Sequence, residues 1–175
     1  MRKINYQEVC KRSVELSRKT FNYLSSTFKH ILEKFLQEYE FDRDLKLYPL
    51  VCGSLVEGLL IVKSDVDFAF LLEGTFSTKD ISTIKSLLSN FLKEAESTLK
   101  EKFNLKGFCY FSRFIRFTSM LTAQSKTRRA SFRLFFYTFS KALNTPPYRI
   151  IASEEDVKRF KLALINSSDS PLHGS

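Results

Sequence analysis

Hydrophobic residues recur at three- and four-residue steps over residues 6–40, and this spacing predicts a long amphipathic helix at the N-terminus. The apolar stripe consists of Val14, Phe21, Leu24, Phe28, Ile31, Leu32, Phe35 and Tyr39. Because most helices in globular proteins are much shorter, the pattern also allows a helix pair with a break near Ser25 and Ser26.

Two short apolar runs follow the long helical pattern. Residues 47–52 predict a buried strand that enters a turn at Gly53, although Pro49 indicates that this strand begins late or lies at an edge. Residues 66–72 predict a second strand, because an apolar run of this length is too short for an ordinary helix.

A second helix and a third strand are predicted next. Ser77 has the features of an N-cap, with Asp80 placed to bond back to it, and Gly107 predicts the helix end. Residues 108–118 alternate aromatic and polar or basic side chains, a pattern typical of a strand.

The remaining part of the chain has weaker patterns. Residues 122–129 predict a polar, basic loop, residues 131–143 fit a helix better than a strand, and residues 144–147 break the chain. Ser153 and the acidic residues after it predict the cap of a final helix that runs to about Ile165.

These elements predict an α+β fold. The length of 175 residues suits one compact domain, which we place at residues 1–166, followed by a flexible tail at residues 167–175. No apolar run reaches the roughly 18–20 residues of a membrane span, and the start lacks the apolar stretch of a secretory signal. The sequence therefore predicts a cytoplasmic protein without a membrane partner.

The net charge of +9 comes from one segment. Residues 102–153 carry 10 Lys and Arg and no acidic residue, whereas residues 1–101 are balanced. Such a segment favours a polyanion, including nucleic acid, although a half-buried strand with solvated arginines is the alternative. The candidate polyanion-binding residues are Arg113, Arg116, Lys126, Arg128, Arg129 and Arg133.

The three cysteines, Cys10, Cys52 and Cys109, have no metal-binding spacing. Their number is odd and their surroundings are apolar. The sequence therefore predicts buried free thiols in a reducing compartment.

The residues that carry chemistry surround the turn after the first predicted strand. Gly53 allows close approach of the backbone to a ligand, and Ser54 adds a hydroxyl and a backbone N–H. Asp65 and Asp67 share one face of a strand, where they repel each other unless a cation lies between them. Oxygen ligands of this kind suit Mg²⁺ and its phosphate substrates, and so predict metal-assisted phosphoryl or nucleotidyl transfer.

This segment resembles the signature of the DNA polymerase β-like nucleotidyltransferase superfamily, in particular its small, minimal type. An apolar strand, Gly-Ser, ten intervening residues and Asp-apolar-Asp follow in the same order, and Gly58 and Ser64 also match. The resemblance covers residues 47–72 strongly. It implies a nucleotidyltransferase-type α+β fold, with a small mixed β-sheet flanked by helices.

The resemblance also implies roles for individual residues. Gly53, Ser54 and Ser64 would hold the triphosphate of an NTP, while Asp65 and Asp67 would be catalytic and bind Mg²⁺ (or Mn²⁺). A nucleoside monophosphate would pass to a hydroxyl of a protein, a nucleic acid or a small molecule. Small members of the superfamily often work beside a helical protein partner.

The chain departs from the superfamily pattern in two places. Glu57 stands where many small members carry Arg or Lys, and residues 108–118 lack the third carboxylate that the family usually supplies from a later strand. Glu73 and residues 154–156 are weak candidates for that ligand. The alternative function is therefore a catalytically inactive module that binds nucleic acid or a partner through residues 102–153.

Overall fold

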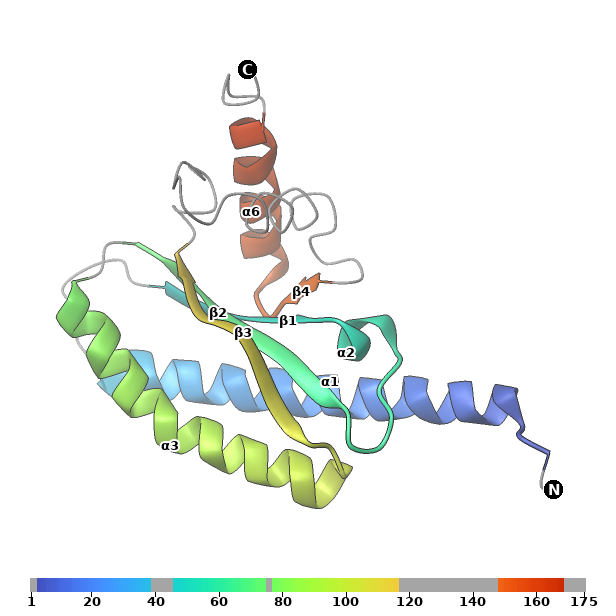
Figure 1. The fold of residues 1–175 in the computed structure, drawn as a ribbon. Helices are drawn as coiled ribbons and strands as arrows, with labels where there is room; N and C mark the ends of the chain where they lie inside the picture. The colour runs from blue at the N-terminus through green and yellow to red at the C-terminus, as the bar shows by residue number, and fades with distance from the viewer. Residues whose placement is uncertain (1–2, 39–45, 75–76, 117–147, 169–175) are drawn as a thin grey trace.

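The computed structural model describes residues 3–38, 46–74, 77–116 and 148–168. Within these residues the chain is an α+β protein, with one four-stranded mixed sheet and helices on both of its faces (Figure 1). This confirms the predicted class and the small mixed sheet. The loop at 122–129, the predicted helix at 131–143 and the break at 144–147 lie outside the described residues.

Helix α1 (Tyr6–Glu38) is one continuous helix. Of the two alternatives that the pattern allows, the long helix is confirmed and the helix pair with a break at Ser25 and Ser26 is not formed. The apolar stripe continues through this point, where Leu24 and Phe28 are both buried against the sheet. The Phe28 ring stacks on Phe68 with 5.0 Å between ring centroids. Packing on the sheet thus stabilises a helix longer than propensity alone would support.

The strands are β1 (Lys46–Cys52), β2 (Asp65–Glu73), β3 (Gly107–Arg116) and β4 (Tyr148–Ile150), in the spatial order β3-β2-β1-β4. Strand β1 is antiparallel to β2 and to β4, whereas β2 and β3 are parallel. Strand β4 was not predicted, since its three residues are too short to show a pattern.

Pro49 lies inside β1, so the prediction of a late start or an edge position is wrong. Strand β4 pairs only with residues 50–52 of β1, and the Pro49 carbonyl accepts a hydrogen bond from the Ile151 N–H at 2.9 Å. The backbone N and O atoms of one strand residue point to the same side of the strand, so the nitrogen of Pro49 also faces β4. The β4 ladder covers only residues 50–52 of β1, so the absent N–H of Pro49 removes no hydrogen bond from that ladder.

Helix α3 (Thr78–Phe103) connects β2 to β3. The predicted capping box is confirmed, because Ser77 and Asp80 bond to each other's backbone N–H. The predicted end at Gly107 is wrong: Asn104, with φ of 54°, is the left-handed C-cap. Asn tolerates this conformation, while Gly107 begins β3.

The two faces of the sheet pack against different helices. Helices α1 and α3 cover the face that carries Val51, Val66 and Phe68. On the opposite face, the ring of Tyr48 meets Phe160 of helix α6 (Glu154–Ser168) edge-on, at 5.0 Å. Helix α6 includes the first two residues of the predicted tail. None of the helices in the described ranges is long and apolar enough to cross a membrane.

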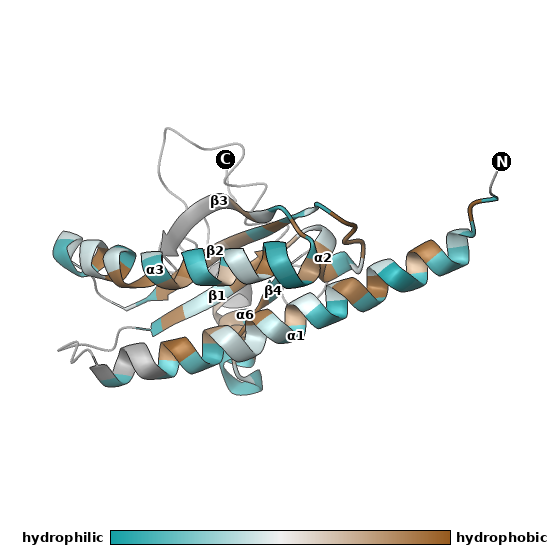
Figure 2. Cartoon of the chain, turned by 90° about the horizontal axis from the view of Figure 1, so that it is seen from below, coloured by the Kyte–Doolittle hydropathy of each residue, from teal (hydrophilic) through white to brown (hydrophobic). Residues whose placement is uncertain are grey.

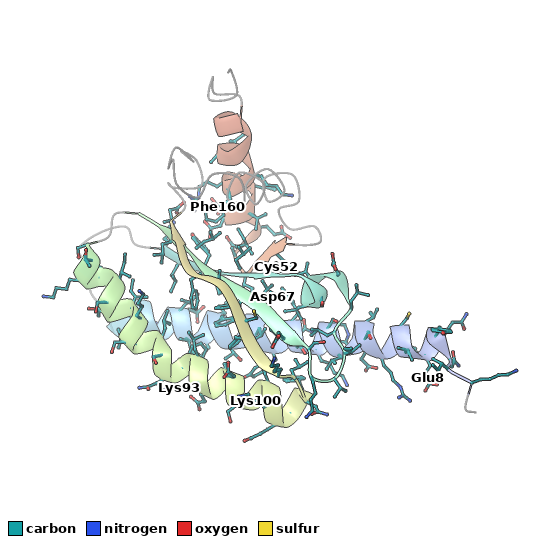
Figure 3. The ribbon with its side chains drawn as sticks, viewed as in Figure 1. Glu8, Cys52, Asp67, Lys93, Lys100 and Phe160 are labelled. Atoms are coloured by element: carbon teal, nitrogen blue, oxygen red, sulfur yellow. The ribbon has the colours of Figure 1, made fainter. Side chains whose placement is uncertain are left out.

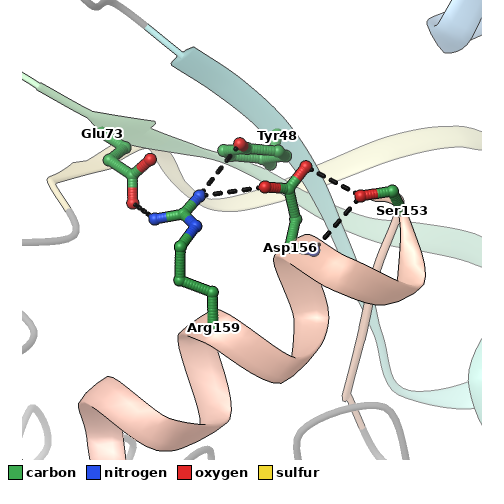
Figure 4. A network of polar contacts seen from close by, with 5 residues as sticks. All are labelled: Tyr48, Glu73, Ser153, Asp156 and Arg159. Carbon is green, nitrogen blue, oxygen red and sulfur yellow. Dashed lines mark hydrogen bonds and ion pairs between the residues drawn. The ribbon is translucent and has the colours of Figure 1, made fainter.

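A polar network fixes α6 to the sheet (Figure 4). The Arg159 guanidinium forms ion pairs with Glu73 and Asp156 and donates to the Tyr48 hydroxyl at 3.3 Å. Ser153 accepts the Asp156 N–H at 3.2 Å, which confirms the predicted cap. Burial, with the nearby carboxylates, raises the pKa of Tyr48 to about 12, so the phenol remains protonated at neutral pH.

Replacement of Arg159 should therefore loosen α6. We expect Arg159→Ala to lower the free energy of unfolding by about 1–2 kcal/mol, because two partly buried carboxylates lose their partner. The control is Arg12→Ala in the exposed pair with Glu8, which should cost at most about 0.5 kcal/mol. Equal effects in urea denaturation would contradict an anchoring role for Arg159.

Candidate functional site

The candidate site begins where β1 ends, at Gly53. Its backbone has φ of 69° and ψ of −142°, which side chains of L-residues rarely adopt. A Cβ atom built on Gly53 would lie 2.5 Å from Oδ2 of Asp67. The turn therefore needs glycine for two reasons, and the Asp67 carboxylate lies directly against its backbone.

The turn continues into a short helix, α2 (Ser54–Glu57). The Gly53 carbonyl accepts the N–H groups of Val56 and Glu57, each at 3.1 Å, and Gly58 ends the helix in the left-handed conformation. Ser54 is half-buried beside the carboxylate site. The turn is thus short and hydrogen-bonded, and its backbone adjoins Asp67.

Ser64 closes the loop that returns the chain to β2. Its hydroxyl accepts the Ile61 N–H, and its own N–H donates to the Ile61 carbonyl, both at 3.0 Å. These bonds place the chain just before Asp65. Phosphate binding by Ser64 stays a prediction, since its hydroxyl already accepts a hydrogen bond within the loop.

Asp65 and Asp67 lie on one face of β2, separated by one residue. Asp65 is exposed and Asp67 is half-buried. Burial, and secondly the charge of Asp65, raise the pKa of Asp67, while a hydrogen bond from Cys109 opposes the shift. A cation between the carboxylates would offset their mutual repulsion and favour the charged form of Asp67.

Two cysteines flank Asp67 on the neighbouring strands. Cys52 of β1 and Cys109 of β3 are its register partners, so the three residues form one row across the sheet. Figure 3 labels Cys52 and Asp67 at the end of the sheet beside α2, apart from Phe160 of α6. The Cys109 thiol donates a hydrogen bond to the Asp67 carboxylate.

The prediction of buried thiols is wrong for two of the three cysteines. All three are free, but Cys10 and Cys109 are exposed and Cys52 is half-buried. Sequence reasoning missed Cys109 as a site residue because it looked for a carboxylate in β3. The available signal was strand alternation, since Cys109 follows Gly107 by two residues, just as Asp67 follows Asp65.

The surroundings of Cys52 predict slow thiol chemistry. Burial, and then the charges of Asp67 and Cys109, raise its pKa from 9.0 to about 12, which reduces its thiolate fraction near neutral pH by about 10³. We expect iodoacetamide at pH 8 to alkylate exposed Cys10 readily and Cys52 last, as followed by peptide mass spectrometry. Comparable rates at the two positions would contradict this environment for Cys52.

The donor set fits a cation that takes few protein ligands. In the described ranges, no three His, Cys, Asp or Glu side chains form a group that could hold a metal ion. Mg²⁺ commonly uses only one or two carboxylates, together with water and substrate phosphates. Asp65 and Asp67 supply that number, and the Gly53 backbone lies against the Asp67 carboxylate.

The candidate polyanion-binding residues do not join this site as far as the structure describes them. Arg116 pairs with Leu72, about 23 Å along β2 from Asp65. Arg113 lies in the register irregularity of β3. Lys126, Arg128, Arg129 and Arg133 lie outside the described residues.

The weak candidates for a third carboxylate have structural roles. Glu73 pairs in register with Lys46, at the end of β2 away from Asp65, and forms an ion pair with Arg159. Residues 154–156 form the first turn of α6, as predicted. Glu57 is exposed on α2, so its charge does not require a buried partner.

Compared with known proteins, the chain matches no protein-family model, no curated protein and no solved structure. The resemblance to nucleotidyltransferases therefore depends on the residues of the motif itself. The structure adds one fact to that motif: its glycine turn and its second aspartate are in contact.

Proposed function

We propose that this protein is a divalent-cation-dependent nucleotidyltransferase. It transfers a nucleoside monophosphate from an NTP to a hydroxyl group of a protein, a nucleic acid or a small molecule. The observation that carries the proposal is the contact between the Gly53 turn and Asp67, because it brings a candidate phosphate-binding backbone beside paired carboxylates. The nucleotidyltransferase-type fold is part of the same proposal.

Each residue of the site has a role in this proposal. Asp65 and Asp67 would hold Mg²⁺ or Mn²⁺, which when bound supplies positive charge for the phosphates and for the attacking oxygen. Gly53 and Ser54 would orient the triphosphate through the backbone, and Ser64 would keep Asp65 in place. Strand β3, parallel to β2, forms the neighbouring wall of the site.

An apolar loop beside the site favours a protein as acceptor or partner. Leu59, Ile61 and Val62, which connect α2 to Asp65, are between 57% and 59% exposed. Figure 2 shows this hydrophobic loop, and further hydrophobic residues towards the N-terminal end of α1. Tyr6 and Val14 of α1 are also exposed. A helical partner would find an uncovered apolar surface here.

The test is transfer of label from each α-labelled NTP, with Mg²⁺ or Mn²⁺, to the protein itself, RNA and DNA. We expect label that requires the divalent cation and disappears in Asp65→Asn/Asp67→Asn. The matched control is Asp80→Asn, which changes a carboxylate in the capping box of α3. Label that survives in the double variant would refute the proposal.

A second candidate function is polyanion binding without catalysis. The observation that favours it is Cys109, which stands opposite Asp67 on β3, the strand predicted to supply a third carboxylate. The 10 basic residues of segment 102–153 would then provide the binding surface. This function needs neither a cation nor an NTP.

Salt dependence separates the second candidate from the first. We expect the logarithm of RNA or DNA affinity to fall linearly with the logarithm of salt concentration, because each neutralised phosphate releases counterions. Arg128→Ala/Arg129→Ala should reduce that slope by about 1–2. An unchanged slope in fluorescence anisotropy would remove these residues from the binding surface.

A further inference from the structure

A hydrogen-bonded corner lies directly before Asp65. The Lys63 N–H donates to the Asn104 carbonyl at 2.8 Å. The Lys106 N–H donates to the Ser64 carbonyl at 3.0 Å. These two bonds join the loop before β2 to the turn before β3, so the backbones of Lys63 and Lys106 are neighbours at the end of the sheet that carries Asp65.

The backbone conformation of Lys63 is unfavourable for a lysine. Within the described ranges, Lys63 and Asn104 are the only residues other than glycine with positive φ, at 67° and 54°. This left-handed region strains a residue that has a Cβ atom, whereas glycine adopts it freely. Asparagine tolerates it, and Asn104 ends helix α3 there. Strain of this kind is found at functional sites, so the presence of lysine at position 63 indicates a role for its side chain.

Both lysines of the corner are available to a ligand. Lys63 and Lys106, which we call the lysine pair, are exposed. Neither has an ion-pair partner in the part of the chain that the structure describes. Glu96 of α3 is already engaged, because it accepts the Phe108 N–H at 3.2 Å and pairs with Lys100 at 3.5 Å.

The other side of the carboxylates has the opposite charge. Residues 53–57, which form the glycine turn and α2, contain one acid, Glu57, and no base. Strand β2 lies between β1 and β3, so Asp65 and Asp67 separate the Gly53 turn from the lysine pair. In phosphoryl transfer the attacking and leaving oxygens are roughly in line, on opposite sides of the phosphorus. With the triphosphate at the Gly53 turn, the acceptor would approach from the lysine pair.

We propose that the lysine pair binds a phosphate of the acceptor, so that the acceptor hydroxyl belongs to a nucleotide or to the 3′ end of a polynucleotide. Lysine binds phosphate as a point charge on a flexible stem. The acceptor oxygen bonds to the α-phosphorus of the NTP, and the bond from this phosphorus to the β-phosphate oxygen breaks. Pyrophosphate leaves with the electron pair, and the hydroxyl proton passes to solvent. The inference rests on the proposed function, and it leaves the apolar loop to a protein partner rather than to the acceptor.

The first test compares acceptors with and without phosphate. Transfer of label from α-labelled NTP, by the full chain with Mn²⁺, is measured to each nucleoside, to its 5′-monophosphate and to a trinucleotide. We expect label on the phosphorylated acceptors and at least tenfold less on the nucleosides, because a hydrogen bond to a charged group is lost. A preference for the trinucleotide identifies a polynucleotide as acceptor, and equal transfer to the monophosphate identifies a free nucleotide.

The second test changes the lysines. Lys63→Gln/Lys106→Gln should raise the KM of the phosphorylated acceptor about 10–100-fold and leave the KM of the NTP unchanged. Lys93→Gln, on the exposed side of α3 (Figure 3), should change neither. Lys63→Gly should also raise the acceptor KM, although it relieves the strained backbone and should be at least as stable as the parent. Asn104→Gly relieves the same strain without loss of charge, and should keep the parent KM.

Three results would overturn the inference and leave the proposed function intact: equal transfer to nucleosides and nucleotides, label on the protein alone, or an unchanged acceptor KM in Lys63→Gln/Lys106→Gln. If the parent labels no acceptor, the proposed function fails. Fluorescence anisotropy with a labelled trinucleotide then tests the lysine pair by itself. Binding that is at least tenfold weaker in the double variant supports the phosphate site, and equal binding overturns it.

Discussion

Gly53→Ala should be one of the most disruptive single substitutions in this protein, lowering the free energy of unfolding by about 3 kcal/mol. The backbone at Gly53 has a conformation that alanine rarely adopts. The new methyl would also lie 2.5 Å from Oδ2 of Asp67, so that the carboxylate must move. Any cation-dependent activity should be lost together with stability. Urea denaturation and the nucleotide-transfer assay measure the two effects.

Gly58→Ala is the matched control. Gly58 also has positive φ, but its added Cβ would lie 3.6 Å from the nearest side-chain atom, a Cγ2 of Val14, in ordinary contact. We expect a loss of about 1 kcal/mol from backbone strain alone. In Gly53→Ala/Asp67→Ala the clash is absent, so the double variant should be more stable than the sum of the single effects by about 1 kcal/mol or more. If the changes in the free energy of unfolding simply add, the Asp67 side chain does not clash with the added methyl group.

Asp67→Asn should have the opposite combination of effects: a large loss of activity without loss of stability. The asparagine has nearly the same shape and keeps an oxygen to accept the Cys109 hydrogen bond. It removes the charge that a divalent cation requires, so nucleotide transfer should fall by about 10²–10³-fold or more. Thermal stabilisation of the parent by added Mn²⁺ should also disappear in the variant.

The pH dependence of stability gives a second measurement on the same variant. The pKa of Asp67 is higher in the folded protein than in the unfolded chain, so the folded state binds the proton more tightly. The parent is therefore destabilised by this group at neutral pH and recovers stability as the pH falls through the raised pKa. Without metal, Asp67→Asn should be at least as stable as the parent at pH 7, and the difference should vanish in acid. If Asp67→Asn is less stable than the parent at pH 7, burial of the Asp67 charge does not destabilise the folded protein.

The parts of the fold that the sequence predicted correctly depend on local patterns. The stripe of α1, the capping box at Ser77 and the apolar runs of β1 and β2 each involve residues close in the chain. The glycine turn and the paired aspartates were predictable for the same reason. Their contact through Gly53 follows from the antiparallel pairing of consecutive strands.

The features that sequence reasoning missed depend on contacts between distant segments. Cys109 reaches Asp67 only through the register of a parallel pair, which the intervening helix α3 does not reveal. Strand β4 is defined by its partner β1 rather than by its own three residues. Pro49 is tolerated inside β1 because β4 ends beside it. Such facts require knowledge of which strand lies next to which.

The strand pairings differ greatly in the length of chain that each must close. The antiparallel pair β1–β2 closes only residues 53–64, whereas β4 reaches β1 after residues 53–147. Loop-closure entropy makes the longer closure about 2 kcal/mol more costly. The turn and carboxylates of the candidate site therefore belong to the sheet pairing that can form earliest during folding. Strand β4 and helix α6 join a sheet in which the Gly53–Asp67 contact already exists.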